Sequence, residues 1–228
     1  MFGGVAAVAG VDLSVKRGEL RCLIGANGAG KSTFFKMLSG QLKPSSGQII
    51  INGVDVTGAS AFKIARMGVA TKTQVPNLFD GLSVRENLEV AALSGISRAA
   101  ASVAADDTME EFGLAELGPR PVGTLAHGQR QILELGIVLI KSPQIILLDE
   151  PAAGMTPPEI EHMIKLLDRM RGKHTIIVVE HDMQFIGRIA ELITVFHRGE
   201  VLAEDTLENI MANSSVREAY LGKQREKN

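Results

Sequence analysis

The stretch GANGAGKS, Gly25 to Ser32, most constrains what this chain can fold into, because it fits the pattern G-x-x-x-x-G-K-[ST]. The apolar run ELRCLIG precedes it, and the helical pattern KSTFFKMLSG follows and ends at Gly40. A glycine-rich turn between a strand and a helix lets backbone N–H groups point inward at an anion. The sequence therefore predicts an α/β core with a phosphate-binding loop.

The rest of the chain alternates buried strands with helices, which predicts a largely parallel sheet. The predicted strands are DLSV, QIII before an Asn-Gly turn, QIILLDE, HTIIVVE, and LITVFHRGEVLA with a turn at Arg198-Gly199. Residues 77–140 are mostly helical and Ala-rich, and the capping-box pattern SVRE, Ser83 to Glu86, opens a helix there. We predict one domain, residues 1–228. Its nucleotide-binding core comprises residues 1–76 and 141–228, and residues 77–140 form an inserted helical subdomain.

Composition excludes several classes. The chain has 228 residues with 26 acidic and 24 basic side chains, so it lacks the basic excess typical of nucleic-acid binding. No apolar run approaches the roughly 20 residues of a membrane-spanning helix, and no signal peptide is visible. Cys22, the single cysteine, lies in an apolar run. We expect it to be a buried core residue in a reducing compartment.

The segment IILLDE delivers two carboxylates to the carboxyl end of a buried strand. After a phosphate-binding loop, Asp149 is suited to hold Mg²⁺ and Glu150 to polarise a water against a terminal phosphate. The alternative is an ordinary solvated strand end.

Five elements occur together in order and spacing: GANGAGKS, Gln74, LAHGQ, IILLDEP and VVEHD. Over nearly the whole chain this set resembles an ABC-type ATPase subunit. The segments FGGVAAV, DEPAAGMTP, VVEHDM and VREAYLG are similar to the ATP-binding subunits of bacterial uptake transporters for branched-chain amino acids, urea and short amides. GELRCLIG, LAHGQ and GKHTIIVVEHDM lean toward the urea and amide branch.

The resemblance implies ATP and Mg²⁺ as cofactors and assigns roles to particular residues. Catalysis would use Glu150, His181 and Gln74, and Mg²⁺ would be held by Ser32, Gln74 and Asp149. Phe2 would stack on adenine, or be an exposed terminal side chain. Gln74 and His181 have the alternatives of a polar loop residue and a structural histidine. The loop residues that would bind phosphate are Gly25, Asn27, Gly28, Ala29, Gly30, Lys31, Ser32 and Thr33. The amino-terminal antiparallel β region would lack the family's first strand.

LAHGQ resembles the family's signature loop but departs from it in sequence. In the head-to-tail dimer of the family, this loop and the N-terminus of the helix after it face the γ-phosphate bound by the partner subunit. The resemblance places Ala126, His127, Gly128 and Gln129 at that phosphate. Ala126 replaces the usual Ser and would lose one charge-assisted hydrogen bond, about 1.5–3 kcal/mol. His127 replaces a Gly and would either donate to phosphate or point away. The alternative is neutral variation.

Three further residues have an expected role outside the nucleotide site. Thr156 stands where many family members carry Asp, and TPPE predicts that it caps the next helix. Leu78 and Phe79 belong either to a coupling surface near residues 74–80 for a permease helix or to local packing.

The predicted protein is therefore an ATP-binding and hydrolysing subunit that catalyses in-line attack of water on the γ-phosphate. Its predicted partners are transmembrane permease subunits, a second ATP-binding subunit in a homo- or heterodimer, and, indirectly, a solute-binding protein, with no nucleic acid. It would lie peripherally on the cytoplasmic side of the plasma membrane. One alternative is a soluble ABC-type ATPase acting on nucleic acid or the ribosome. Another is a P-loop kinase, in which LAHGQ and VVEHD have no role.

Overall fold

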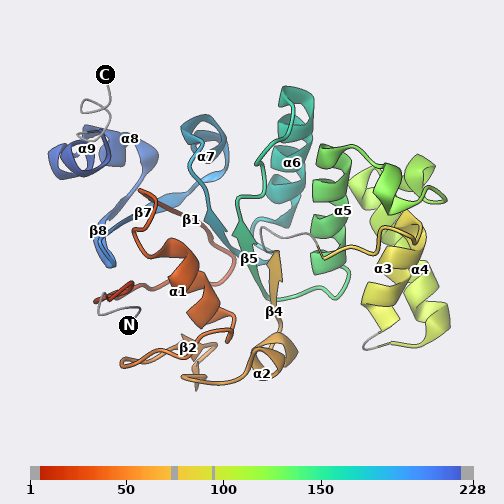
Figure 1. Cartoon of the computed structure of the whole chain (residues 1–228), viewed down its shortest axis with the longest axis horizontal. Coiled ribbons are helices and arrows are strands. Elements are labelled where there is room, and N and C mark those ends of the chain that lie inside the picture. The colour runs from red at the N-terminus through yellow and green to blue at the C-terminus, as the bar shows by residue number, and fades with distance from the viewer. Residues whose placement is uncertain (1–5, 73–76, 94–95, 222–228) are drawn as a thin grey trace.

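A computed structural model describes residues 6–72, 77–93 and 96–221 (Figure 1). Its main sheet has six strands in the order β4-β5-β6-β1-β7-β8, in which only β8 runs antiparallel to its neighbour. The strands are β1 (Leu20–Gly25), β4 (Val69–Lys72), β5 (Ile145–Asp149), β6 (Thr175–Val179), β7 (Leu192–His197) and β8 (Glu200–Asp205). The prediction of a largely parallel sheet is confirmed, as is the turn at Arg198-Gly199, where both residues have positive φ.

Helices α3, α4 and α5 gather beside the β4 edge of the sheet, apart from α1, α8 and α9 (Figure 1). We propose this group as the helical subdomain predicted at residues 77–140. The described helices are α1 (Lys31–Leu38), α2 (Ala61–Arg66), α3 (Val84–Leu93), α4 (Arg98–Phe112), α5 (His127–Leu139), α6 (Pro157–Met170), α7 (Met183–Ile189), α8 (Leu207–Ala212) and α9 (Ser214–Leu221). In the part of the chain that the structure describes, no helix is both long enough and apolar enough to cross a membrane.

Alternate residues of the central strands face two separate cores, which explains their continuous apolar sequences. Leu20, Cys22 and Ile24 of β1 join the core that contains α3 to α7. Leu23 joins the second core, which is built from α1, α2 and the hairpin of β2 (Ile50–Ile51) and β3 (Val54–Asp55). Cys22 is fully buried, as predicted.

Two predicted strands differ from the structure. QIII contributes only Ile50–Ile51 to β2, although the turn at Asn52-Gly53 is present. The strand predicted at DLSV is wrong, because residues 12–15 have no ladder partner among the described residues. Leu13 and Val15 still pack against the second core. The alternating pattern of DLSV therefore predicted which side chains are buried but not whether the backbone pairs with another strand.

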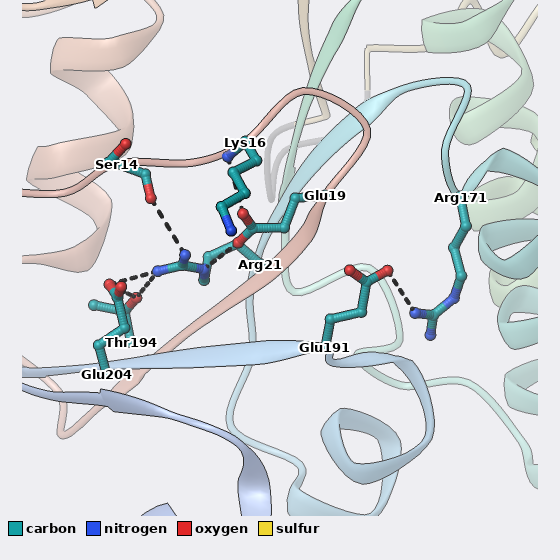
Figure 2. A network of polar contacts seen from close by, with 8 residues as sticks. All are labelled: Ser14, Lys16, Glu19, Arg21, Arg171, Glu191, Thr194 and Glu204. Atoms are coloured by element: carbon teal, nitrogen blue, oxygen red, sulfur yellow. Dashed lines mark hydrogen bonds and ion pairs between the residues drawn. The ribbon is translucent and has the colours of Figure 1, made fainter.

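Side chains replace that missing ladder at the amino end of β1, as Figure 2 shows. The guanidinium of Arg21, 2% exposed, donates to Glu19 Oε1 at 2.6 Å and to the carbonyl of Ser14 at 3.2 Å. It also donates to Thr194 Oγ1 at 2.9 Å and forms an ion pair with Glu204. A buried charge of this kind is stable only when it is fully paired. The network fastens β1 to β7, β8 and the chain before β1.

Candidate active site

The phosphate-binding loop follows β1 and leads directly into α1. A Cβ atom added at Gly25 would lie 2.3 Å from the carbonyl oxygen of Phe196, and one at Gly30 would lie 2.3 Å from that of Ala7. Both glycines also have positive φ. Only glycine fits this close approach of backbones. The first turn of α1 contains no acidic residue, so its N–H groups remain suited to an anion.

A cavity of about 370 Å³ opens above this loop. Its lining residues are Ala7, Asn27, Gly28, Ala29, Gly30, Lys31, Ser32, Thr33, Glu150 and Val179. All predicted loop residues except Gly25, which ends the strand, therefore line the same cavity. Nζ of Lys31 donates to the carbonyl oxygens of Gly25 at 2.5 Å and Ala26 at 3.2 Å. Burial lowers the pKa of Lys31, while the charges of Glu150 and Asp149 oppose that shift.

Asp149 ends β5 with one oxygen that has no hydrogen-bond partner in the part of the chain that the structure describes. Its Oδ1 is buried, and none of the described residues donates a hydrogen bond to it. Burial, followed by the charge of Glu150, raises the pKa of Asp149. Mg²⁺ takes oxygen ligands and is commonly held by one or two carboxylates together with substrate phosphates and waters. Asp149, with the Ser32 hydroxyl in the adjacent cavity, fits such a site, although residues 6–72, 77–93 and 96–221 contain no cluster of three or more acidic, His or Cys ligands.

Glu150 and His181 come together because they follow neighbouring parallel strands, β5 and β6. Nδ1 of His181 lies 3.5 Å from Oε1 of Glu150. The backbone of Glu150 has φ 48°, in the left-handed region, and its N–H donates to the carbonyl of Val179 at 2.9 Å. This turn carries the Glu150 side chain to the rim of the cavity.

The LAHGQ loop packs against its own chain. Ala126 is the N-cap of α5, and Oε1 of Gln129 accepts from its N–H at 3.0 Å. Nε2 of His127 lies 2.9 Å from the carbonyl oxygen of Ala153, in the loop that follows Glu150. His127 therefore has a partner that neither sequence-based alternative included.

Gly128 provides a second contact within this chain. A Cβ atom added there would lie 2.1 Å from the carboxyl carbon of Glu159 on α6. Glu159 in turn accepts from the N–H and the hydroxyl of Thr156, both at 2.7 Å. Thr156 is the N-cap of α6, as predicted, and Pro157 follows it. The Glu159 side chain makes the capping bonds, because the Thr156 hydroxyl donates to Glu159 and accepts no N–H from the helix. A larger residue at position 128 would therefore displace the end of the Glu159 side chain from its present position.

Sequence reasoning missed a buried ion pair between the sheet and α5. Nζ of Lys72, 3% exposed, lies 3.3 Å from Oε2 of Glu134, 8% exposed. Oε1 of Glu134 accepts from the N–H of Asn77 at 3.1 Å. Glu134 therefore contacts the chain on both sides of Gln74. Gln74 and Phe2 themselves lie outside the described residues. A single acid inside the apolar helix sequence ILELGI was the available signal.

Leu78 and Phe79 differ in burial, and a permease contact stays a prediction. Leu78 packs against the core that contains α3 to α7. Phe79 is 55% exposed, while its backbone N–H and carbonyl are bonded to the buried side chain of Asn87 at 2.8 and 3.1 Å. Phe79 is thus an apolar side chain held at the surface by a fixed backbone.

The family model described as ABC transporter matches residues 8–153. The chain belongs to the ABC transporter family. Its similarity to a named relative extends further: the chain is 38% identical over 239 residues to the high-affinity branched-chain amino acid transport ATP-binding protein BraF of Pseudomonas aeruginosa, covering 97% of this chain and 94% of BraF.

Solved structures agree with the assignment of this ABC ATPase. The ADP conformation of an ATP-binding cassette of an ABC transporter matches with TM-score 0.86 and 26% identity, covering 97% of this chain and 94% of that one. A dimeric cassette in a post-hydrolysis state with ADP and Pi matches with TM-score 0.79 and 25% identity, covering 89% and 91%. The predicted family, fold and ATPase activity are confirmed, and the protein binds adenine nucleotide.

Proposed function

We propose that this ABC ATPase hydrolyses ATP to drive a bacterial uptake transporter for branched-chain amino acids. The name and near-complete coverage of BraF support that cargo. The lean of three sequence segments toward urea and short amides stays a prediction. No observation favours the alternative of action on nucleic acid or the ribosome, and the net charge of −2 speaks against it.

The observation that carries the proposed site is that Glu150 lines the phosphate-loop cavity and lies 3.5 Å from His181. The N–H groups of residues 25–33 and the ammonium of Lys31 would bind the phosphates. Glu150 would orient the attacking water and accept its proton, and His181 would hold Glu150 and the γ-phosphate in line.

The free Oδ1 of Asp149 and the hydroxyl of Ser32 would hold Mg²⁺, together with Gln74. When bound, Mg²⁺ would neutralise charge on the phosphate oxygens. Phe2 remains our proposal for the residue that stacks on adenine.

The proposed partners follow from the family. A dimeric relative supports a second ATP-binding subunit, whose phosphate would face the α5 N-terminus with residues 126–129. Permease subunits would keep the protein peripheral on the cytoplasmic side of the plasma membrane, with a solute-binding protein acting through them. The exposed Phe79 on its fixed backbone suits a permease contact.

Two variants test this proposal. Glu150→Gln should keep ATP affinity and lower turnover by about 10²–10⁴-fold, the usual contribution of a catalytic base. Lys31→Ala should instead weaken ATP binding measured by calorimetry. Turnover near that of the parent in Glu150→Gln would remove Glu150 from the mechanism, and unchanged ATP affinity in Lys31→Ala would contradict the binding loop.

The cargo needs its own experiment, because the transported substrate does not contact this chain. The permease that co-purifies with it from native membranes should be reconstituted in vesicles with its solute-binding protein. Leucine should then stimulate ATP hydrolysis and uptake. Stimulation by urea or acetamide but not by leucine would assign the transporter to the other branch.

A further inference from the structure

Glu180 is a buried carboxylate that contacts two separate loops of the site. It directly follows β6 and is 2% exposed. Its Oε1 accepts from the N–H of Ala152 at 3.2 Å. Its Oε2 accepts from the N–H groups of His181 at 2.9 Å and Asp182 at 3.4 Å. One side chain therefore joins the loop after β5 to the loop after β6.

Each of these loops carries one residue of the proposed chemistry. Ala152 lies two residues after Glu150, and the second loop begins with His181. We propose that Glu180 is a positioning residue that sets the geometry of Glu150 against His181. It would do so through these backbone bonds and through its own contact with the His181 ring, whose Nδ1 lies 3.8 Å from Glu180 Oε2. The inference rests on the proposed function, since it assumes that those two side chains act on ATP.

Two properties of the Glu180 carboxylate explain this role: burying its charge costs free energy, and both of its oxygens accept hydrogen bonds. An ionised carboxylate in a buried place is stable only with several hydrogen bonds, and bonds to a charged acceptor are about twice as strong as neutral ones. Glu180 has two oxygens that satisfy donors on opposite sides. An amide of the same shape has one oxygen and one NH₂ group, so one of the two loops would face a donor.

The loop after β5 depends on such anchoring. The left-handed φ of 48° at Glu150 is uncommon for a residue other than glycine and persists only when its surroundings hold it. Other contacts also hold this loop from outside: the carbonyl of Val179 accepts from Glu150 N–H, and His127 contacts Ala153. The ring of His181 lies 3.5 Å from the Glu150 carboxylate, and Ala152 and Met155 pack into the core. Loss of the Glu180 contact would therefore allow Glu150 to shift, and a shift of about 1 Å at a reacting group lowers a rate by about 10²-fold.

A purely structural role would give a different result, and Glu19 offers the matched control. Glu19 is a second buried carboxylate, 7% exposed, which accepts from the N–H of Lys16 at 2.9 Å and from Arg21 at 2.6 Å (Figure 2). It lies at the amino end of β1, away from the cavity lining. Glu19→Gln should lower the free energy of unfolding without changing kcat or ATP affinity.

The kinetic experiment compares the full chain with its Glu180→Gln, Glu180→Asp, Glu19→Gln and Glu150→Gln variants, by steady-state ATP hydrolysis and ATP calorimetry. Glu180→Gln should lower kcat by about 10²-fold while KM and ATP affinity stay within about twofold. Glu180→Asp keeps the charge but shortens the side chain, so it should also fail to span both loops and lower kcat. If Glu180→Gln does not fold, Glu180→Asp carries the test.

Amide hydrogen exchange gives a readout that needs no turnover. Glu180→Gln should speed exchange at Ala152 in one loop or at His181 and Asp182 in the other, while Glu19→Gln leaves all three unchanged. In a double-mutant cycle, Glu180→Gln should lower kcat little further once His181→Ala has lowered it, because both substitutions disturb the same arrangement of Glu150 and His181.

The outcomes separate this inference from the proposed function. A parental kcat in Glu180→Gln, or unchanged exchange at all three amides, would overturn the positioning role. If Glu180→Gln lowers kcat no more than Glu19→Gln does, Glu180 contributes only to stability. Parental turnover in Glu150→Gln would instead remove Glu150 from the proposed mechanism, on which this inference rests.

Discussion

Nε2 of His127 is hydrogen-bonded to the carbonyl oxygen of Ala153 at 2.9 Å, so the N-terminus of α5 is joined to the loop that follows Glu150 in the same chain. A carbonyl only accepts, so this bond requires the proton of the His127 ring on Nε2, and the contact of Nε2 with the Gln131 amide nitrogen is then not a hydrogen bond. The same nitrogen lies 3.2 Å from Nε2 of Gln131. A contact of this nitrogen with the partner subunit's phosphate would have to replace the bond to Ala153.

This relationship predicts the behaviour of His127→Ala. The variant should not weaken ATP-driven dimerisation in a Glu150→Gln background, because the ring is engaged within its own chain. It should lower the free energy of unfolding by about 1 kcal/mol, the net value of one hydrogen bond. Analytical ultracentrifugation with ATP measures the first quantity and urea denaturation the second. A dimer dissociation constant raised tenfold or more would show that His127 reaches the phosphate.

Ala126→Ser should stabilise the chain even without nucleotide. Ala126 has the extended backbone of an N-cap, φ −63° and ψ 158°, but no side-chain acceptor. A serine hydroxyl there would accept from an N–H of the first turn of α5 and add about 1 kcal/mol. Ala126→Cys, similar in size but a weak acceptor, is the control. In the Glu150→Gln background, Ala126→Ser should also tighten the ATP-bound dimer, by about tenfold for each 1.4 kcal/mol gained. An unchanged dimer would mean that the departure from serine is neutral for closure.

Gly128→Ala should destabilise the chain through Glu159. The new methyl group would overlap the carboxylate, whose atoms lie 2.1 to 2.5 Å from the Cβ position, and force it away from Thr156. We expect a loss of about 1 kcal/mol, the net value of a typical hydrogen bond, because the displaced carboxylate gives up its bonds to Thr156. In a Glu159→Ala background the same substitution should be nearly neutral, because the obstacle is gone. Equal losses in both backgrounds, measured by urea denaturation, would contradict the contact.

Asp149→Asn should raise stability in the absence of nucleotide, and the gain should depend on pH. The folded-state pKa of Asp149 lies above its ordinary value of 3.8, because burial and Glu150 disfavour the charge. Ionised Asp149 therefore destabilises the folded chain. The penalty is absent well below pH 3.8, appears as pH rises past that value, and is complete above the raised pKa.

Asp205→Asn is the control of opposite sign. Hydrogen bonds with Asn209 and Thr206 lower the pKa of Asp205, so its contribution to stability is present above the ordinary value and is lost as pH falls through the lowered one. Urea denaturation between acid and neutral pH should give opposite trends for the two variants. A pH-independent effect of Asp149→Asn would contradict the assigned cause.

Cys22 should be unreactive in the folded protein. It is fully buried, and burial together with the charge of Glu180 raises its pKa to about 12. A thiol reagent at pH 8 should modify it only in denaturant, since the thiolate is the reactive form. Rapid modification without denaturant, followed by mass spectrometry, would show that the core around β1 opens.

The amino-acid sequence was sufficient for those features that local patterns encode. The glycine spacing of the phosphate-binding loop, the alternation of strands and helices and the caps at Ser83 and Thr156 were predicted and are present, because each depends on residues within a few positions of one another. The resemblance to the family assigned Glu150 and His181 to the same reaction but did not include the contact between their side chains.

Only the tertiary structure decided which distant groups meet. The alternation of DLSV indicates a half-buried segment but not whether a strand lies beside it. In the structure the Arg21 side chain, and not a neighbouring strand, donates to the carbonyl of Ser14 in this segment. Neither the bond from His127 to Ala153 nor the ion pair of Lys72 and Glu134 has a local pattern. Glu180 likewise looks like a polar residue at a strand end, and its link to Ala152, 28 positions away, exists only because the parallel sheet sets β5 beside β6.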